Sequence, residues 1–352
     1  MDRIARLREK MMVKGIDYVL LGPNSDCFYL TSFREEQMER PLLFVVSLDD
    51  HFFLAPKLYD EQITQLGYRV EAYGDGEDPF SKLTLERGRS VYLDDWLPTF
   101  ISLSIVERYG PSKVGRASEL LSPMRAVKDE DEIALMETAV RVSEKVLEEV
   151  LPTIKEGLSE KHVSRLIENK ARELGSQGPS FEPIVTSGPN TSMPHMRSTD
   201  RKLKNGDPIV LDYGIRWKGY NTDTTRTVFL SRPSAEVERI YNVVKEAQSI
   251  AEERVRSGMS GAEADSLART VISRAGLGQF FIHRTGHGIG IDVHEPPYIS
   301  KDNEEPLVDG NVFTVEPGVY LPGKLGVRIE DMVILRGRAQ VMNSLSKEIL
   351  VL

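Results

Sequence analysis

Two apolar, strand-like segments with carboxylates in their middle constrain this chain more than any other feature. The first lies within residues 209–230, where two β-rich runs flank a loop of four residues. In that register Ile215 pairs with Tyr220, which places Asp212 directly opposite Asp223. Two opposed carboxylates repel each other unless a cation lies between them, and burying them unpaired would cost several kcal/mol per ion. The alternative is that one carboxylate points to solvent, or that both cap loops.

A second hairpin repeats this arrangement. Residues 312–316 and 327–335 read as apolar strands around a loop centred on Gly323, a register that sets Glu316 opposite Glu330. One such pair is a weak signal, but two pairs in two hairpins are a strong one. The four ionised carboxylates carry a charge of about −4, which two divalent cations would neutralise.

Histidine is the expected fifth ligand. The segment 283–297 contains His283, His287 and His294, and His287 lies between two glycines, which allow the backbone to approach a crowded site. A Gly-His-Gly segment alone is more typical of a satisfied core histidine, but four nearby carboxylates favour a metal ligand. Carboxylate and imidazole donors suit Mn²⁺, Co²⁺, Zn²⁺ or Fe²⁺ and disfavour a thiolate site. The segment does not match a phosphate-binding loop.

Pattern and composition predict a two-domain globular chain. The first third alternates helix and strand signals, and we place the boundary at about 122, at a loop, giving domains 1–122 and 123–352. Helical periodicity predicts helices over residues 2–14 and 97–109, a long helix ending before Pro152, a helix at 159–174 and a helix pair at roughly 234–275.

Charge and cysteine content exclude several classes of protein. The 352 residues carry a net charge of −9, which argues against a nucleic-acid partner. The lone Cys27 excludes a disulfide framework within one chain and favours a reducing compartment. Charges interrupt every apolar stretch of residues 1–20, so we expect no signal peptide, no membrane partner and a cytoplasmic location.

The five candidate ligands occur in the order Asp–Asp–His–Glu–Glu, in the settings LDYG, NTDTTRT, GHGIG, VEPG and RIED. This set resembles the pita-bread metallopeptidases: methionine aminopeptidase, aminopeptidase P, prolidase and their metal-free relative creatinase. The resemblance covers about 125–352, and the N-terminal part is similar to that of prolidase and aminopeptidase P. It implies an α+β protein, with a creatinase-like N-terminal α/β domain followed by a catalytic pita-bread domain.

The resemblance also implies a role for each ligand. Two divalent metal ions, Mn²⁺ or Co²⁺ before Zn²⁺ or Fe²⁺, would share the site. Asp223 would bind one ion and His287 the other, Asp212 and Glu330 would bridge them, and Glu316 would bind a metal and move the proton. A metal-activated hydroxide would attack the scissile carbonyl.

Further residues match family positions around the substrate. His195, in SMPHM, corresponds to a histidine over the pocket, and His294 to one that binds the substrate carbonyl. Arg328 would fix the metal carboxylates or contact substrate, with a plain strand salt bridge as the alternative. Thr225 would support Asp223. We read His283, His162 and His51 as structural.

One departure from the family concerns substrate length. Short archaeal prolidases tend to carry an arginine where this chain has Tyr298, and such an arginine suits the carboxylate of a free proline. Arg197 offers a charge nearby.

The resemblance predicts an Xaa-Pro dipeptidase whose partner is a small Xaa-Pro peptide, and a homodimer. The alternatives are an aminopeptidase P acting on longer peptides, a non-catalytic peptide-binding relative and a metal-independent hydrolase like creatinase. The five intact ligands argue against the last two.

Overall fold

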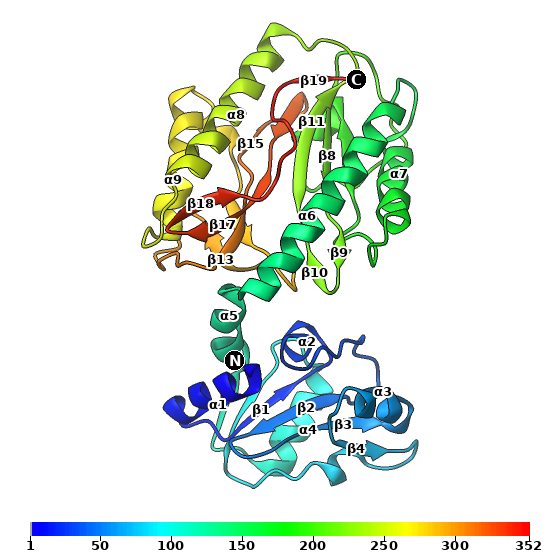
Figure 1. Cartoon of the computed structure of the whole chain (residues 1–352), viewed down its shortest axis with the longest axis vertical. Coiled ribbons are helices and arrows are strands. Elements are labelled where there is room, and N and C mark those ends of the chain that lie inside the picture. Colours follow the sequence, from blue (N-terminus) through cyan, green and yellow to red (C-terminus); the bar gives the residue numbers. More distant parts are fainter. Residues whose placement is uncertain (1) are drawn as a thin grey trace. The chain divides into compact units, whose positions relative to one another are not determined.

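The computed structural model describes residues 2–352, which divide into two compact units, one ending at Arg125 and the other spanning Ala126–Leu352. Both units combine helices and sheets, so the chain is an α+β protein, as predicted (Figure 1). Among the described residues, no helix has the length and apolar character that crossing a membrane would require.

The first unit is built on one mixed sheet. Its described part contains six strands in the order β4-β3-β2-β1-β5-β6, in which β1–β2 and β2–β3 are antiparallel and the other pairs are parallel. The strands are β1 (Tyr18–Leu21), β2 (Leu43–Ser47), β3 (His51–Pro56), β4 (Val70–Tyr73), β5 (Ser90–Leu93) and β6 (Lys113–Arg116). The helices are α1 (Arg3–Lys14), α2 (Ser25–Thr31), α3 (Asp60–Gln65), α4 (Thr99–Tyr109) and α5 (Ser118–Ala126).

The position predicted for the domain boundary is helical rather than a loop. We expected a loop at about residue 122, but helix α5 runs through this position and contains Pro123. Pro123 has no N–H to donate within the helix, and burial of the apolar side chains Leu120, Leu121 and Met124 offsets that local cost. Burial of the apolar face of α5 thus outweighs the tendency of proline to interrupt a helix.

The second unit consists of curved sheets covered by helices (Figure 1). One sheet has the order β19-β11-β8-β7, with β7 (Ile184–Ser187), β8 (Pro208–Tyr213), β11 (Thr224–Phe229) and β19 (Leu350–Val351). The other has the order β13-β12-β14-β17-β18, with β12 (Gly286–Gly288), β13 (Glu295–Ile299), β14 (Val312–Val315), β17 (Asp331–Arg336) and β18 (Arg338–Val341). Two short hairpins pair β9 (Arg216–Trp217) with β10 (Tyr220–Asn221), and β15 (Gly318–Leu321) with β16 (Leu325–Arg328).

Each large sheet has its own pair of helices. Helices α6 (Glu130–Val150) and α7 (Glu160–Glu173) share an apolar cluster with β7, β8 and β11, whereas α8 (Ala235–Arg254) and α9 (Gly261–Arg274) share one with β14, β16 and β17. These helices confirm those predicted from the periodicity of apolar residues. The predicted N-cap Ser159 accepts a hydrogen bond from the backbone N–H of His162. Strand β7 was missed because four residues between glycine- and proline-rich loops give little periodicity.

The predicted register of the first hairpin was wrong by two residues. Lys218 and Gly219 alone form the turn, with φ of 47° and 87°, so Trp217 pairs with Tyr220. A two-residue turn of this kind matches the twist of the strands better than the four-residue loop we assumed. Asp212 therefore lies opposite Thr225 rather than Asp223. A shift of two residues keeps both aspartates on one face of the sheet.

The predicted register of the second hairpin is confirmed. Val315 pairs with Asp331 and Gly318 with Arg328, the register that sets Glu316 and Glu330 across from each other. The two glutamates lie between the paired segments, where Glu330 instead bridges to Thr225 of the other sheet. The second hairpin thus joins the two sheets at the carboxylates.

Gly286, next to His287, generates a prediction about this scaffold. A Cβ at Gly286 would lie 1.8 Å from the backbone oxygen of Thr314, so Gly286→Ala must displace β12 from β14. We expect this change to destabilise the second unit by roughly 1–3 kcal/mol or more, measured by chemical unfolding. Gly74→Ala is the matched control, because its nearest neighbours are side-chain ends at 3.6 Å or more. An unchanged midpoint for Gly286→Ala would contradict this close approach.

Candidate metal and peptide site

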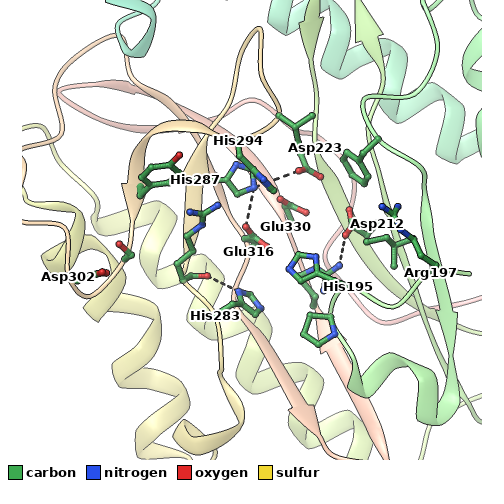
Figure 2. A pocket seen from close by; sticks show the side chains of 18 residues that line it. His195, Arg197, Asp212, Asp223, His283, His287, His294, Asp302, Glu316 and Glu330 are labelled. Atoms are coloured by element: carbon green, nitrogen blue, oxygen red, sulfur yellow. Dashed lines mark hydrogen bonds and ion pairs between the residues drawn. The ribbon is translucent and has the colours of Figure 1, made fainter. Parts of the chain in front are cut away.

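Strand ends of both sheets bring the candidate residues into one cavity of about 760 Å³. Asp212 is the second-last residue of β8, Asp223 directly precedes β11, and His287 is the middle residue of β12. Glu316 follows β14 and Glu330 precedes β17. All five line the cavity, as Figure 2 shows.

His287, Asp223 and Glu330 form the tightest group in the cavity. They are buried, and each offers one ligand atom within 4.8 Å of the other two. The Nε2 atom of His287 also lies 3.3 Å from an oxygen of Glu316 and 3.7 Å from one of Asp223. Burial, together with the nearby His294, lowers the pKa of His287 well below its usual value. The ring is therefore neutral at pH 7 and can donate a lone pair to a cation.

The carboxylates of the cavity are electrostatically frustrated. Burial first, and then the neighbouring acids, raise the pKa of Asp223 and of Glu330 well above their usual values. Burial also raises the pKa of Glu316 to about 7. Within residues 2–352, one oxygen each of Asp212, Asp223 and Glu330 is buried without a hydrogen-bond partner. Buried oxygens of this kind are costly unless another group binds them, and this donor set fits divalent cations.

Arg328 is the cation that the chain itself places among these acids. It is buried; its guanidinium donates to Asp212 at 2.5 Å, to the Thr225 hydroxyl at 3.2 Å and to the Tyr320 hydroxyl at 2.8 Å. Of the two roles predicted for Arg328, its hydrogen bond to Asp212 supports the one in which it holds a metal carboxylate. The prediction that Thr225 supports Asp223 was wrong, because its hydroxyl donates to Glu330 at 2.6 Å. The reason is the two-residue register shift together with the bridge between Thr225 and Glu330.

The predicted substrate residues lie in the same cavity. His195, His294 and Tyr298 line it, and the His294 and His287 rings are 4.1 Å apart in an edge-on arrangement. Burial, followed by the charge of Arg284, lowers the pKa of His294, so that ring is also neutral at pH 7. A neutral imidazole can donate one N–H to a carbonyl oxygen.

Two cavity residues, and a tyrosine that contacts two cavity side chains, were missed or misread in the sequence. His283, which we read as structural, lines the cavity and contacts the Tyr320 hydroxyl at 2.9 Å. Tyr320 could have been found from the hairpin register, because it lies two residues from Gly318, which pairs with Arg328. Arg284 lines the cavity too, and only its position three residues before His287 hinted at that.

Comparisons with known proteins agree with this geometry. Residues 134–336 match the model of metallopeptidase family M24, and residues 3–127 match the creatinase/prolidase N-terminal domain. A recombinant prolidase from Thermococcus sibiricus has a solved structure with a TM-score of 0.96 and 38% identity, covering 99% of this chain and 98% of that one.

Two more relatives are named for different activities. A Pyrococcus horikoshii protein named Xaa-Pro dipeptidase is 30% identical over 95% of this chain and 94% of its own length. The structure of an X-Pro aminopeptidase from Thermotoga maritima matches with a TM-score of 0.89 and 32% identity, covering 100% of both chains. With a family match over more than half of its residues and relatives this similar over nearly its whole length, the chain belongs to metallopeptidase family M24 and carries a creatinase/prolidase N-terminal domain.

Proposed function

We propose that this protein is a metal-dependent Xaa-Pro dipeptidase, which hydrolyses the peptide bond before a C-terminal proline. The observation that carries the proposal is the set of buried carboxylate oxygens without hydrogen-bond partners, gathered beside a neutral imidazole in a peptide-sized cavity. The Xaa-Pro specificity rests on the relatives, among which a Thermococcus sibiricus structure is named a prolidase and a Pyrococcus horikoshii protein an Xaa-Pro dipeptidase.

Two divalent ions, Mn²⁺ or Co²⁺ in our proposal, would be held by the five cavity ligands. Asp212, Asp223, His287, Glu316 and Glu330 would hold the ions. The free oxygens of Asp212, Asp223 and Glu330 support their role as ligands. When bound, such ions polarise a carbonyl and make a water molecule acidic near pH 7.

The other residues of the cavity would position and protonate the substrate. His294 would donate its N–H to the scissile carbonyl, and His195 would contact the substrate from the cavity wall. Glu316, oriented by the Thr314 hydroxyl at 3.3 Å, would carry the proton to the leaving proline nitrogen. Arg328 would hold the Asp212 carboxylate in place, since it donates to one of its oxygens and leaves the other free.

A second candidate is an Xaa-Pro aminopeptidase that acts on longer peptides. It is favoured by the similarity to the Thermotoga maritima X-Pro aminopeptidase, which covers both chains fully. A non-catalytic peptide-binding protein remains a remote alternative. The homodimer and the cytoplasmic location stay predictions of the sequence.

Loss of metal should abolish hydrolysis. We expect Asp223→Asn and His287→Ala to bind less metal and to lower kcat/KM for Ala-Pro by more than roughly 100-fold, because losing even a supporting residue of a metal site costs about 10- to 100-fold. Elemental analysis and peptide assays measure the two effects. Asp200→Asn is the control, since this exposed acid pairs with Lys161 on the surface. Full activity after chelation would rule out the metal-dependent mechanism.

Substrate length separates the two candidate activities. With added Mn²⁺ or Co²⁺, we expect turnover of Ala-Pro, much slower turnover of Ala-Pro-Ala, and none of Met-Ala. Chromatography of the products measures all three reactions under one set of conditions. Equal turnover of the tripeptide would instead support the aminopeptidase, and no turnover of any peptide would support the binding protein.

Metal binding should release protons in a pH-dependent way. Because the pKa of Glu316 is about 7 without metal, its carboxyl is mostly protonated at pH 6 and must lose that proton to bind a cation. Metal affinity should therefore fall as the pH drops below about 7. Calorimetry in buffers of different ionisation enthalpy should detect more protons released at pH 6 than at pH 8.

Glu316→Gln tests the source of these protons. This variant should release fewer protons at pH 6, whereas Asp200→Asn should behave like the unmodified protein. Equal release at the two pH values in the unmodified protein would show that Glu316 does not titrate in this range.

A further inference from the structure

The cavity contains one arginine that has no ion-pair partner among residues 2–352. Three arginines line it: Arg197, Arg284 and Arg328. Arg328 donates to Asp212 at 2.5 Å, and Arg197 lies 3.3 Å from the carboxylate of Glu182. Within residues 2–352, the guanidinium of Arg284 makes no ion pair within 4.0 Å and donates no hydrogen bond, although acids crowd the same cavity.

The local structure holds this free guanidinium in a defined place. Its central carbon lies 4.5 Å from the ring centroid of Tyr298. Tyr298 is itself fixed in β13, where it pairs with His287 of β12. Packing on an aromatic ring restricts the guanidinium while leaving its N–H edges able to donate to a planar anion. The cavity thus offers a positioned and unsatisfied fork of donors beside the strand pair that carries His287.

We propose that Arg284 binds the C-terminal carboxylate of the substrate and thereby selects dipeptides. This inference rests on the proposed function, and it names the substrate group that Arg284 recognises. A dipeptide brings one carboxylate into the cavity, and the four acids at the metal ligands repel it. A guanidinium fork binds a carboxylate through two parallel hydrogen bonds, a geometry that neither an amide nor a longer chain at that position can reproduce.

Arg284 is a better candidate for this role than Arg197. The side chain of Arg197 is 64% exposed and is already paired with Glu182, so solvent and that acid both weaken its hold on a ligand. Arg284 is partly buried and unpaired, which strengthens a charge-assisted hydrogen bond. Arg197 therefore provides the matched control variant.

The test compares Ala-Pro with its amide Ala-Pro-NH₂, which has lost only the negative charge. In the metal-loaded protein we expect Arg284→Gln to raise KM for Ala-Pro by roughly 10- to 100-fold, the usual value of hydrogen bonds to a charged group. KM for Ala-Pro-NH₂ should change by less than about threefold. Arg284→Lys should recover part of the loss, because it keeps the charge without the fork. Arg197→Gln should leave the ratio of the two KM values unchanged.

Two outcomes would overturn the inference while leaving the proposed function intact. One is an equal effect of Arg284→Gln on both substrates. The other is a selective loss with Glu-Pro-NH₂, which would show that Arg284 binds an acidic Xaa side chain instead. Unfolding midpoints of all variants check that the fold is unchanged.

A binding assay separates this inference from the proposed function. If the unmodified protein hydrolyses no peptide, the proposed function fails, but calorimetry with free proline and prolinamide still tests Arg284. We expect proline to bind more tightly than prolinamide, and Arg284→Gln to remove that difference. Equal affinities in the unmodified protein would overturn the inference.

Discussion

The burial of several carboxylates in one cavity is the constraint on which the second unit depends. Asp223 and Glu330 are pushed toward protonation by burial and by each other, and Arg328 offsets only part of that repulsion. A chain could relieve the strain by letting the acids turn to solvent. Here each acid lies within a buried strand or directly next to one, so the sheets hold the acids together. The negative charge of these carboxylates therefore requires cations from outside the chain to neutralise it.

A second ionic cluster, behind the cavity, keeps the ligand-bearing strands together. The Arg226 guanidinium donates to the backbone oxygens of Thr225 and Glu330 at 2.9 and 2.7 Å, and so ties β11 to the start of β17. Asp331 balances that charge at 2.7 Å and also accepts Lys347, from the C-terminal segment, at 2.8 Å. Because these groups are buried and paired, breaking one contact would leave an uncompensated charge. Contacts to both the side chain and the backbone oxygen of Glu330 therefore hold the two sheets together.

The sequence predicted the chemistry of the site better than its pairings. Glu316 and Glu330 lie across from each other as their hairpin implied, since the turn at Gly323 was identified correctly. Asp212 and Asp223 share a face of the sheet but are not paired across the strands. The turn type depends on two residues with positive φ, which the sequence pattern did not reveal. His283 and Arg284 could not be predicted, because their place in the cavity depends on contacts between segments far apart in sequence, whereas the hairpin register placed Tyr320 near Arg328. Family resemblance could supply the ligands, but not these contacts.

The distribution of charge in the cavity gives a physical reason for exopeptidase behaviour. The acids gather where cations would bind, and Arg284, the cavity arginine without an ion pair in the described part of the chain, packs on Tyr298 of the strand beside His287. A short peptide has a single carboxylate, and fixing it also fixes the carbonyl one residue away. Such orientation removes translational and rotational freedom before the reaction begins. A longer peptide would place a neutral amide against Arg284 and leave that charge partly buried without a partner, which costs binding energy. Length selection can therefore arise from one charge and need not involve a closed wall.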